Sequence, residues 1–350
     1  MADGQNANVG FSSYLTVGRE VTFKTYSTAT AGLDFLSASF STKKDAKIIE
    51  AVRNSRTMVD RIGLGKTVEG EVEWAMAADS DASQYILQNA MGGGVISTAT
   101  ATGDTAGSGV LEHTYSINNF DVTYSSLCFN HRKGDGTNGK IFEYSGARVN
   151  EFGVKAELDE LLIANAKIMM CDSSSGGGDR SGSMTNTGQS PLVFTNMRFS
   201  VEGTFASLTA SAFWHVQSIE IGIANNLKSD SSARRIGSDL LQVLPPGVAS
   251  FTLNCSMRFD TLTAYNAMLN ETQLACQAQF DGPTLSGSVL KQMLRFDFPR
   301  VYIQDAGDPE VSGPDEILKS DITFMVLQDD ATSTGYACKA IARNKTASYA

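Results

Sequence analysis

Residues 61–70 read RIGLGKTVEG, and the triplet Gly65-Lys66-Thr67 matches the last part of a phosphate-binding loop. Such a loop needs a glycine five residues before Gly65, so that backbone N–H groups can turn toward a phosphate, and a helix directly afterwards. Asp60 stands at the glycine position, and residues 68–76 alternate between apolar and glutamate side chains as a half-buried strand does. The segment therefore predicts entry into a β-sheet and not a nucleotide site.

Metal and calcium sites also lack their ligand patterns. The three histidines, His113, His131 and His215, form neither an H-x-x-x-H nor an H-E-x-x-H spacing. Residues 79–83 begin like a calcium loop, but Gln84 and Ala90 stand where that loop needs glycine and a bidentate glutamate. We therefore expect no metal and no cofactor, and we expect residues 79–83 to cap a helix.

Hydrolytic chemistry has little support in the sequence. The chain contains no G-x-S-x-G motif, and its scattered carboxylates define no facing pair. A sugar-binding sandwich generally exposes tryptophans, whereas Trp74 and Trp214 lie in apolar strand contexts that are typical of a core. We expect the chain not to be an enzyme, and a carbohydrate-binding or glycosidase-like β-sandwich stays an alternative.

The one concentration of positive charge lies in a polar stretch, residues 42–66, between two predicted strands. No aromatic residue stands between Phe40 and Trp74, so the stretch lacks the aromatic interleaving of a nucleic-acid patch. A solvated loop is one interpretation, and an arm that reaches acidic groups on a neighbouring subunit is another. The candidate contact residues of this arm are Lys43, Lys44, Lys47, Arg53, Arg56 and Arg61.

Composition limits the classes of protein that the chain can belong to. Its 350 residues suffice for two domains, and its net charge of −10 opposes tight binding to nucleic acid. No apolar run reaches the length of a membrane helix, and residues 1–7 do not resemble a secretion signal. The five cysteines lack a C-x-x-C spacing, and we expect them to be reduced, mostly buried thiols: Cys128, Cys171, Cys255, Cys276 and Cys338.

Short alternating runs bounded by Gly, Asp, Asn and Ser predict a mainly β protein with mostly antiparallel strands. The runs 140–144 and 148–157 are expected to be separate strands after a hairpin tip at 134–139. Two short helices are expected at 81–91, with Asp81 or Ser83 as cap, and at 260–269. Each helix directly follows a strand.

The repeated order of strand and helix suggests an internal duplication. Tyr85 pairs with Tyr265, Met76 with Met257, and the strands 148–157 and 162–170 with 320–327 and 336–342. We expect two β-plus-helix domains, at 1–172 and 191–350, joined by a Gly/Ser-rich linker or mobile hairpin at 173–190. Residues 97–109 and 305–315 are expected to be further loops.

The arrangement resembles bacteriophage tail tube proteins, in which an arginine-bearing loop precedes a V-x-G-x-V strand and a short helix that ends in glycine. The first half carries this order in residues 53–56, 61–63, 66–74 and 85–92. The second half is similar in residues 235–238, 244–248, 251–257 and 265–269, with Ser250 taken as the counterpart of Gly70. The likeness covers most of the chain.

This resemblance implies two tandem tail-tube-type β-sandwich or barrel domains whose sheets join between subunits into a ring. Single-domain members form hexamers, so a duplicated chain implies self-assembly into a trimeric, pseudo-hexameric ring, in preference to a hexamer. Stacked rings would form the tail tube of the virion, a negatively lined conduit for DNA ejection. The resemblance also implies contacts with the tape measure protein and with tail-terminal or baseplate proteins, and synthesis in the host cytoplasm.

Two other classes stay open besides this structural virion role. A monomeric sugar-binding sandwich would show exposed aromatic residues, and a capsid decoration protein would not polymerise into hollow tubes.

Overall fold

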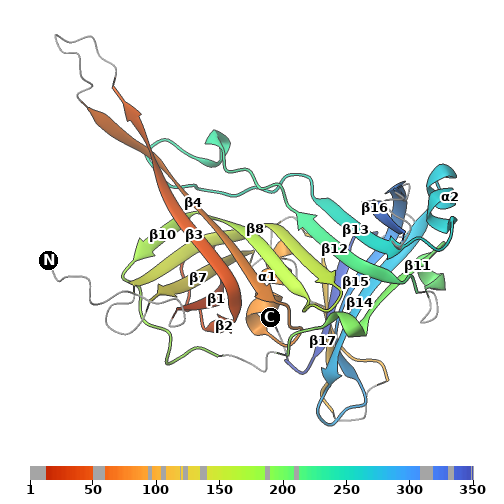
Figure 1. The fold of residues 1–350 in the computed structure, drawn as a ribbon. Helices are drawn as coiled ribbons and strands as arrows, with labels where there is room; N and C mark the ends of the chain where they lie inside the picture. The colour runs from red at the N-terminus through yellow and green to blue at the C-terminus, as the bar shows by residue number, and fades with distance from the viewer. Residues whose placement is uncertain are drawn as a thin grey trace.

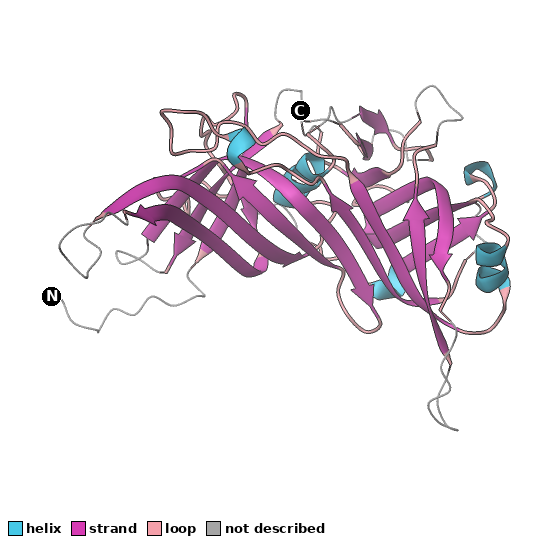
Figure 2. Cartoon of the chain, turned by 90° about the horizontal axis from the view of Figure 1, so that it is seen from above, coloured by secondary structure: helices cyan, strands magenta, loops and turns pink. Residues whose placement is uncertain are grey.

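The computed structural model describes residues 13–49, 60–93, 97–103, 108–118, 120, 125–134, 140–185, 190–208, 213–307, 318–329, 335–347 and 349 (Figure 1). The expected class is confirmed, because these residues are mainly β and the named strands all pair antiparallel. Figure 2 shows strands side by side along the whole length of the molecule.

Four strands of the first half form one sheet whose two faces differ in polarity. β4 pairs with β3 on one side and with β9 on the other, and β9 pairs with the second part of β8. Along β4, Val68, Val72 and Trp74 are buried, while Glu69 and Glu71 between them are exposed, as the alternation predicts. The strands are β3 (Phe35–Ile48), β4 (Arg61–Ala75), β8 (Lys140–Glu157) and β9 (Ile163–Met170).

The long strand β8 belongs to two sheets. Its first part pairs with β7 and β10, and β7 continues through β1 to β2. Residues 140–144 and 148–157, expected as separate strands, are continuous because Gly146, with φ of 62°, lies in a bulge that does not reverse the chain. These flanking strands are β1 (Tyr14–Glu20), β2 (Ala31–Leu33), β7 (Ser126–Lys133) and β10 (Asp172–Ser175).

The second half continues the first sheet without a break. β12 pairs with the second part of β8 and with β13, and β16 joins β13 to the end of β15. The order β3-β4-β9-β8-β12-β13-β16-β15 is therefore one sheet, which we call the long sheet. Its second-half strands are β12 (Val216–Ala224), β13 (Ser250–Arg258), β15 (Lys291–Asp305) and β16 (Lys319–Val326).

A second flanking sheet is built around the first part of β15. β14 and β17 pair with β15 on either side, and β11 pairs with β14. β6, from the first half of the chain, extends this sheet by pairing with β17 and β5. The strands are β5 (Ser97–Thr100), β6 (Leu111–Ser116), β11 (Met197–Glu202), β14 (Leu274–Thr284) and β17 (Lys339–Asn344).

Three register irregularities occur at topologically equivalent places in the two halves. Asn150 is unpaired in the β8–β9 ladder, and Gln304 is unpaired in the β15–β16 ladder. Leu36 is likewise unpaired in the β3–β4 ladder and Gln217 in the β12–β13 ladder, and the third pair is Cys128 in the β7–β8 ladder with Ala275 in the β14–β15 ladder. Because a bulge fixes which residues face each other, these sites align the halves residue by residue.

The resulting alignment corrects three pairings expected from the sequence. Met257 occupies the place of Trp74 and not that of Met76, because Met257 lies opposite the start of β12 and Trp74 lies opposite the start of β3. Leu253, not Ser250, occupies the place of Gly70. The strand expected at 320–327 corresponds to β9, while residues 148–157 correspond to the end of β15. Sequence spacing missed these shifts because the connections between equivalent strands differ in length, whereas the bulges occur at the same places in both halves.

Each half carries one α-helix between equivalent strands. α1 (Asp81–Ala90) buries Ile86 and Leu87 against the core, and its N-cap is Ser80, whose hydroxyl accepts from the N–H of Ser83. The cap is therefore neither Asp81 nor Ser83, the two expected candidates. The other helices in the described residues are α2 (Thr263–Leu269) and the 3-10 turns η3 (Phe194–Asn196), η4 (Phe205–Ser207) and η5 (Ser231–Ala233).

The two halves share one hydrophobic core and are interlocked at several points. The Gly/Ser-rich stretch begins as β10, and Asp179 accepts from Tyr14 and pairs with Arg132, so this stretch is held against the first half. Tyr349, near the end of the chain, is buried beside Tyr85 of α1. β6 adds a further link, because it comes from the first half and pairs with β17.

Candidate assembly surfaces

The expected arm is a two-stranded ribbon that projects from the body as the continuation of β3 and β4 (Figure 1). Four of the six candidate contact residues, Lys43, Lys44, Lys47 and Arg61, lie on this ribbon and are exposed. Arg53 and Arg56 lie outside the described residues. The arm is therefore a β structure over residues 42–48 and 61–66, and not the irregular loop that its polar composition suggested.

Apolar side chains are also exposed on the arm. Ile48, Ile49, Ile62 and Leu64 line a hollow on the ribbon, with Ile62 51% and Leu64 47% exposed. A two-stranded ribbon is marginally stable alone in water, and clustered exposed apolar residues are typical of an interaction surface. The sequence pattern had drawn attention only to the charges of this segment.

A long irregular segment, residues 225–249, lies over the first half, and we call it the strap. Its Asp239 carbonyl accepts from the N–H of Lys66 at 2.7 Å, beyond the end of β9 along the edge of β4. Arg234 donates to the carbonyl of Lys66 at 3.1 Å and to the hydroxyl of Thr67 at 3.2 Å. The strap thus both accepts and donates hydrogen bonds at the base of the arm.

The strap also buries apolar surface of the first half. Its Leu241 and Leu244 are buried in a small cluster with Cys171, against which Phe23 and Met169 pack. Lys24 donates to the carbonyl of Leu241 at 3.0 Å. The ion pair between Lys44 and Asp239, at 3.2 Å, has both side chains more than half exposed and so contributes little. Burial and backbone hydrogen bonds therefore position the strap.

One face of the long sheet is polar and carries more acidic than basic side chains. Glu69, Glu71 and Glu73 are exposed in a row on β4, and the serines of β3 stand opposite them. Glu151 pairs with Lys167 at 2.6 Å and holds the pKa of that lysine above its usual value. The acidic residues of this face are Glu69, Glu71, Glu73, Glu151, Glu157, Glu220, Asp305 and Asp321, and the basic residues are Lys43, Lys155, Lys167, Arg258 and Lys319.

Both ends of the long sheet have an edge that no described strand covers. β3 pairs only with β4, and the described ladders place only β16 beside Ile303 and Asp305. Exposed N–H and C=O groups on such edges are templates for pairing with another chain. In the middle of the sheet the equivalent edges already meet, because β8 and β12 pair over residues 151–157 and 218–224.

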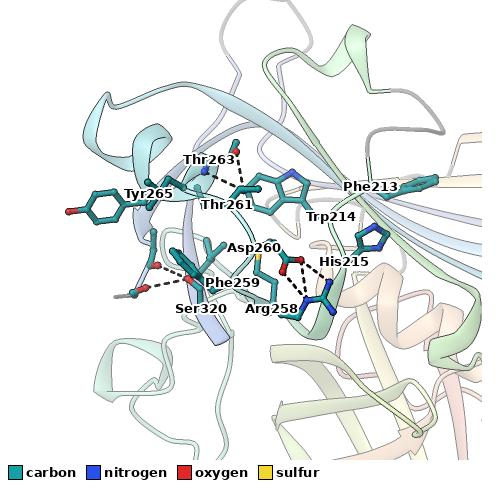
Figure 3. A pocket seen from close by; sticks show the side chains of 16 residues that line it. Phe213, Trp214, His215, Arg258, Phe259, Asp260, Thr261, Thr263, Tyr265 and Ser320 are labelled. Atoms are coloured by element: carbon teal, nitrogen blue, oxygen red, sulfur yellow. Dashed lines mark hydrogen bonds and ion pairs between the residues drawn. The ribbon is translucent and has the colours of Figure 1, made fainter. Parts of the chain in front are cut away.

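An apolar hollow of about 420 Å³ lies between α2 and the end of β15 (Figure 3). In the first half the equivalent space holds Trp74 and Phe152, whose ring centroids are 6.2 Å apart. Met257 and Ala306 take these two places in the second half, and they are too small to fill it. Trp74 is fully buried as expected, whereas Trp214 is only partly buried and lines this hollow.

Polar side chains also line the hollow, among them His215, Asp260 and Ser320. Figure 3 shows Arg258 and Asp260 facing each other, and the guanidinium, at 2.9 Å, holds the pKa of the Asp260 carboxyl below its usual value. The Ser320 hydroxyl donates to the Ala306 carbonyl at 2.7 Å. Among the described residues no cluster of His, Cys, Asp or Glu could hold a metal ion.

The cysteines are free and buried in the structure, as expected. Burial raises the pKa of Cys128 to about 11 and that of Cys255 to about 12, so neither thiol is ionised near neutral pH. None of the helices in the described parts of the chain is long and apolar enough to cross a membrane.

Comparison with known proteins identifies the family of the chain. No curated protein matches the chain. Residues 10–326 match the family model described as phage tail tube protein, which is nearly the whole length. The chain therefore belongs to the phage tail tube protein family.

Proposed function

We propose that copies of this chain close into rings through the two uncovered edges of the long sheet, and that the rings stack into the tail tube. The observation that carries the proposal is the β8–β12 seam inside the chain. β15 has the place of β8 in the second half, and β3 has the place of β12 in the first. Asp305, the last residue of β15, can therefore pair with β3 of the next copy as Glu151 pairs with β12. On this interpretation, the two halves arose by duplication of one domain.

The register of the new seam follows from the register of the existing one. Glu151 faces Ala224 in the β8–β12 ladder, and their counterparts are Asp305 and Lys43. Lys43 of one copy would thus face Asp305 of the next across the seam, on the polar face of the sheet. Opposite charges at facing positions stabilise a strand pair by about 0.2–1 kcal/mol. Lys43, which the sequence predicted as an arm contact, would therefore lie at the seam.

Strand spacing favours three copies in the ring. Each copy contributes eight strands to the long sheet, and a closed barrel of three copies would measure about 45–50 Å between opposite backbones. Side chains extend about 5 Å from each wall, which leaves a lumen of roughly 35–40 Å. A ring of two copies would leave only about 20 Å, which gives no space for a hydrated DNA duplex. We therefore propose a trimeric ring.

The polar face of the long sheet would line this lumen. Its excess of acidic side chains repels phosphates and opposes the Lys and Arg contacts that would hold DNA in place. Genomic DNA would pass without specific binding. As a structural component of the virion tail, made in the host cytoplasm, the tube would enclose the tape measure protein and meet tail-terminal and baseplate proteins at its ends.

Charge reversal at the proposed seam tests the ring. Lys43→Asp and Asp305→Lys should each raise the protein concentration needed for assembly several-fold, and the double variant should restore assembly. Lys319→Asp is the control, because Lys319 faces Arg258 inside the sheet and away from both edges. Negative-stain microscopy would show rings or tubes, and the mass of one ring would give the copy number. A wild-type chain that stays monomeric would overturn the ring, and unaffected assembly in both single variants would overturn the register.

A further inference from the structure

One apolar surface is covered in the first half and bare in the second. Cys171 is fully buried and Met169 is partly buried beneath the strap. The alignment of β9 with β16 places Met325 and Leu327 at the equivalent positions, where they are 44% and 37% exposed. The strap thus covers this surface in the first half, while the equivalent surface of the second half is exposed.

The strap and the arm are equivalent segments. The strap connects β12 to β13, and the arm connects β3 to β4, which are the equivalent strands of the first half. The strap leaves the second half, passes the β8–β12 seam and covers the first half beyond it. The arm leaves β3 at the edge of the molecule, where no described part of the same chain lies beyond it.

We propose that the arm of one copy lies on the second half of the next copy, as the strap lies on the first half of its own chain. This proposal rests on the ring described above. Crossing the β15–β3 seam would bring Ile62 and Leu64 of the arm to the bare surface of Met325 and Leu327. Both surfaces are apolar and exposed in the single chain, and their contact would remove them from water. The arm would then hold the neighbouring copy in place, as the strap holds the first half of its own chain.

This arrangement gives the basic residues of the arm a role within one ring. Lys43 would face Asp305 at the seam, and residues 44–48 and 61–66 would continue over β15 and β16 of the neighbour. Contact between stacked rings would then involve other surfaces.

Cysteine cross-linking tests the proposal because the native thiols are buried and protonated near neutral pH. Two single variants, Ile62→Cys and Leu327→Cys, would be mixed, assembled and mildly oxidised, so that any disulfide between the new thiols must join two copies. A disulfide-linked dimer should form in the mixed assemblies and disappear on reduction. The control partner is Val289→Cys, in the β14–β15 turn, which is 73% exposed and should give no link to Ile62→Cys.

The outcomes separate this proposal from the ring itself. Rings that assemble from the mixtures but give no more link to Leu327→Cys or to Met325→Cys than to Val289→Cys would overturn the arm placement and leave the ring intact. An unmodified chain that forms no rings would remove the basis of both proposals. To exclude an effect of one poorly placed thiol, Met325→Cys would be tested in parallel, and linkage through either position supports the contact.

Discussion

The guanidinium of Arg148 donates from Nη1 to the carbonyl oxygen of Leu244 at 2.7 Å and thereby joins β8 to the strap. Its Nη2 donates to the carbonyl of Phe120 and to the hydroxyl of Ser125, both at 3.2 Å. The ring of Phe23 lies 4.9 Å from the guanidinium carbon. Burial lowers the pKa of Arg148, since backbone carbonyls and rings, not a carboxylate, surround it. One buried side chain thus holds segments that are far apart in the sequence.

Replacement of Arg148 by methionine should therefore destabilise the folded chain. The methionine keeps much of the volume but leaves three buried acceptors without their donor, which costs about 2–4 kcal/mol. Urea unfolding followed by tryptophan fluorescence would measure the loss, because Trp74 and Trp214 report on the two halves. Arg258→Met is the control, since the Arg258–Asp260 pair is exposed and its loss should change stability little. Equal effects of the two substitutions would contradict the anchoring role.

Gly70 is required by the ring of Phe40 on the neighbouring strand. A Cβ at position 70 would lie 2.5 Å from Cδ1 of Phe40, and the ring cannot move easily because it stacks on Tyr144 with centroids 5.0 Å apart. In the second half Leu253 and Ile221 occupy these two places, so a glycine and a large ring are replaced by two aliphatic residues of intermediate size. The larger side chain at the place of Gly70 is thus matched by a smaller one at the place of Phe40.

Gly70→Ala should accordingly cost about 1–3 kcal/mol, because overpacking forces side chains and backbone to shift. The control is Gly203→Ala, where an added Cβ meets no atom within 4 Å and stability should stay the same or rise slightly. Thermal unfolding of both variants beside the wild type measures the difference. A Gly70→Ala protein as stable as its control would show that the Phe40 ring can adjust.

Local patterns in the sequence predicted much of the fold. The alternation in residues 68–76 and the apolar spacing in 81–91 correspond to β4 and α1, because each pattern reports burial on one face of a single element. The partners of the strands were not predictable in this way. Asn150 and Gln304 show why: nothing in their residue types marks a bulge, yet the bulges decide which residues of the two halves correspond.

The candidate site was predicted only in part for a related reason. Charge marked the arm, but its exposed Ile62 and Leu64 resemble the core residues of any strand until a structure shows that nothing covers them. The strap was also missed, since Leu241 and Leu244 lie in an irregular segment without a period. Only tertiary contacts distinguish such a segment from a mobile loop.

His131 should make the protein sensitive to acid. Burial, together with the nearby charge of Lys133, lowers the pKa of His131 from 6.5 to about 4. The neutral ring packs against Phe40, with centroids 5.3 Å apart, and Nδ1 has no hydrogen-bond partner among the residues that the structure describes. The unfolded chain binds a proton at this residue below pH 6.5, and the folded chain does so only near pH 4. The contribution of neutral His131 to the free energy of unfolding is thus complete above pH 6.5. It falls by about 3 kcal/mol as the pH falls to 4.

His131→Phe should remove this part of the pH dependence, because phenylalanine does not titrate. Urea midpoints at pH 7.5, 6, 5 and 4 would be compared between the wild type and the variant, and His131→Gln would serve as a second non-titrating replacement. The difference between wild type and variant isolates His131 from His113, whose pKa is also lowered by burial. Parallel pH profiles for all three proteins would rule out the proposed contribution.

The glutamate row on β4 should keep DNA from adhering to the tube wall. Changing Glu69, Glu71 and Glu73 together to lysine would place a basic row on the face proposed to line the lumen. Assembled tubes of this variant should retain double-stranded DNA at low salt and release it as salt rises, while wild-type tubes should not. The triple glutamine variant removes the charge without adding the opposite one and should also fail to retain DNA. Equal retention by all three tubes would argue against a lumen on this face.

Removal of the arm tests whether the chain can fold without being able to assemble. Lys44 and Lys66 face each other across the β3–β4 ribbon, so residues 45–65 can be replaced by Asn-Gly, which closes a two-residue hairpin between them. The deletion leaves the strap contacts at Lys66 and Thr67 in place, and the core lies elsewhere. We therefore expect a melting temperature close to that of the wild type and a monomer by light scattering, since the seam alone would lack the apolar contact of Ile62 and Leu64. Tubes of normal length from the shortened chain would show that the β15–β3 seam suffices without the arm.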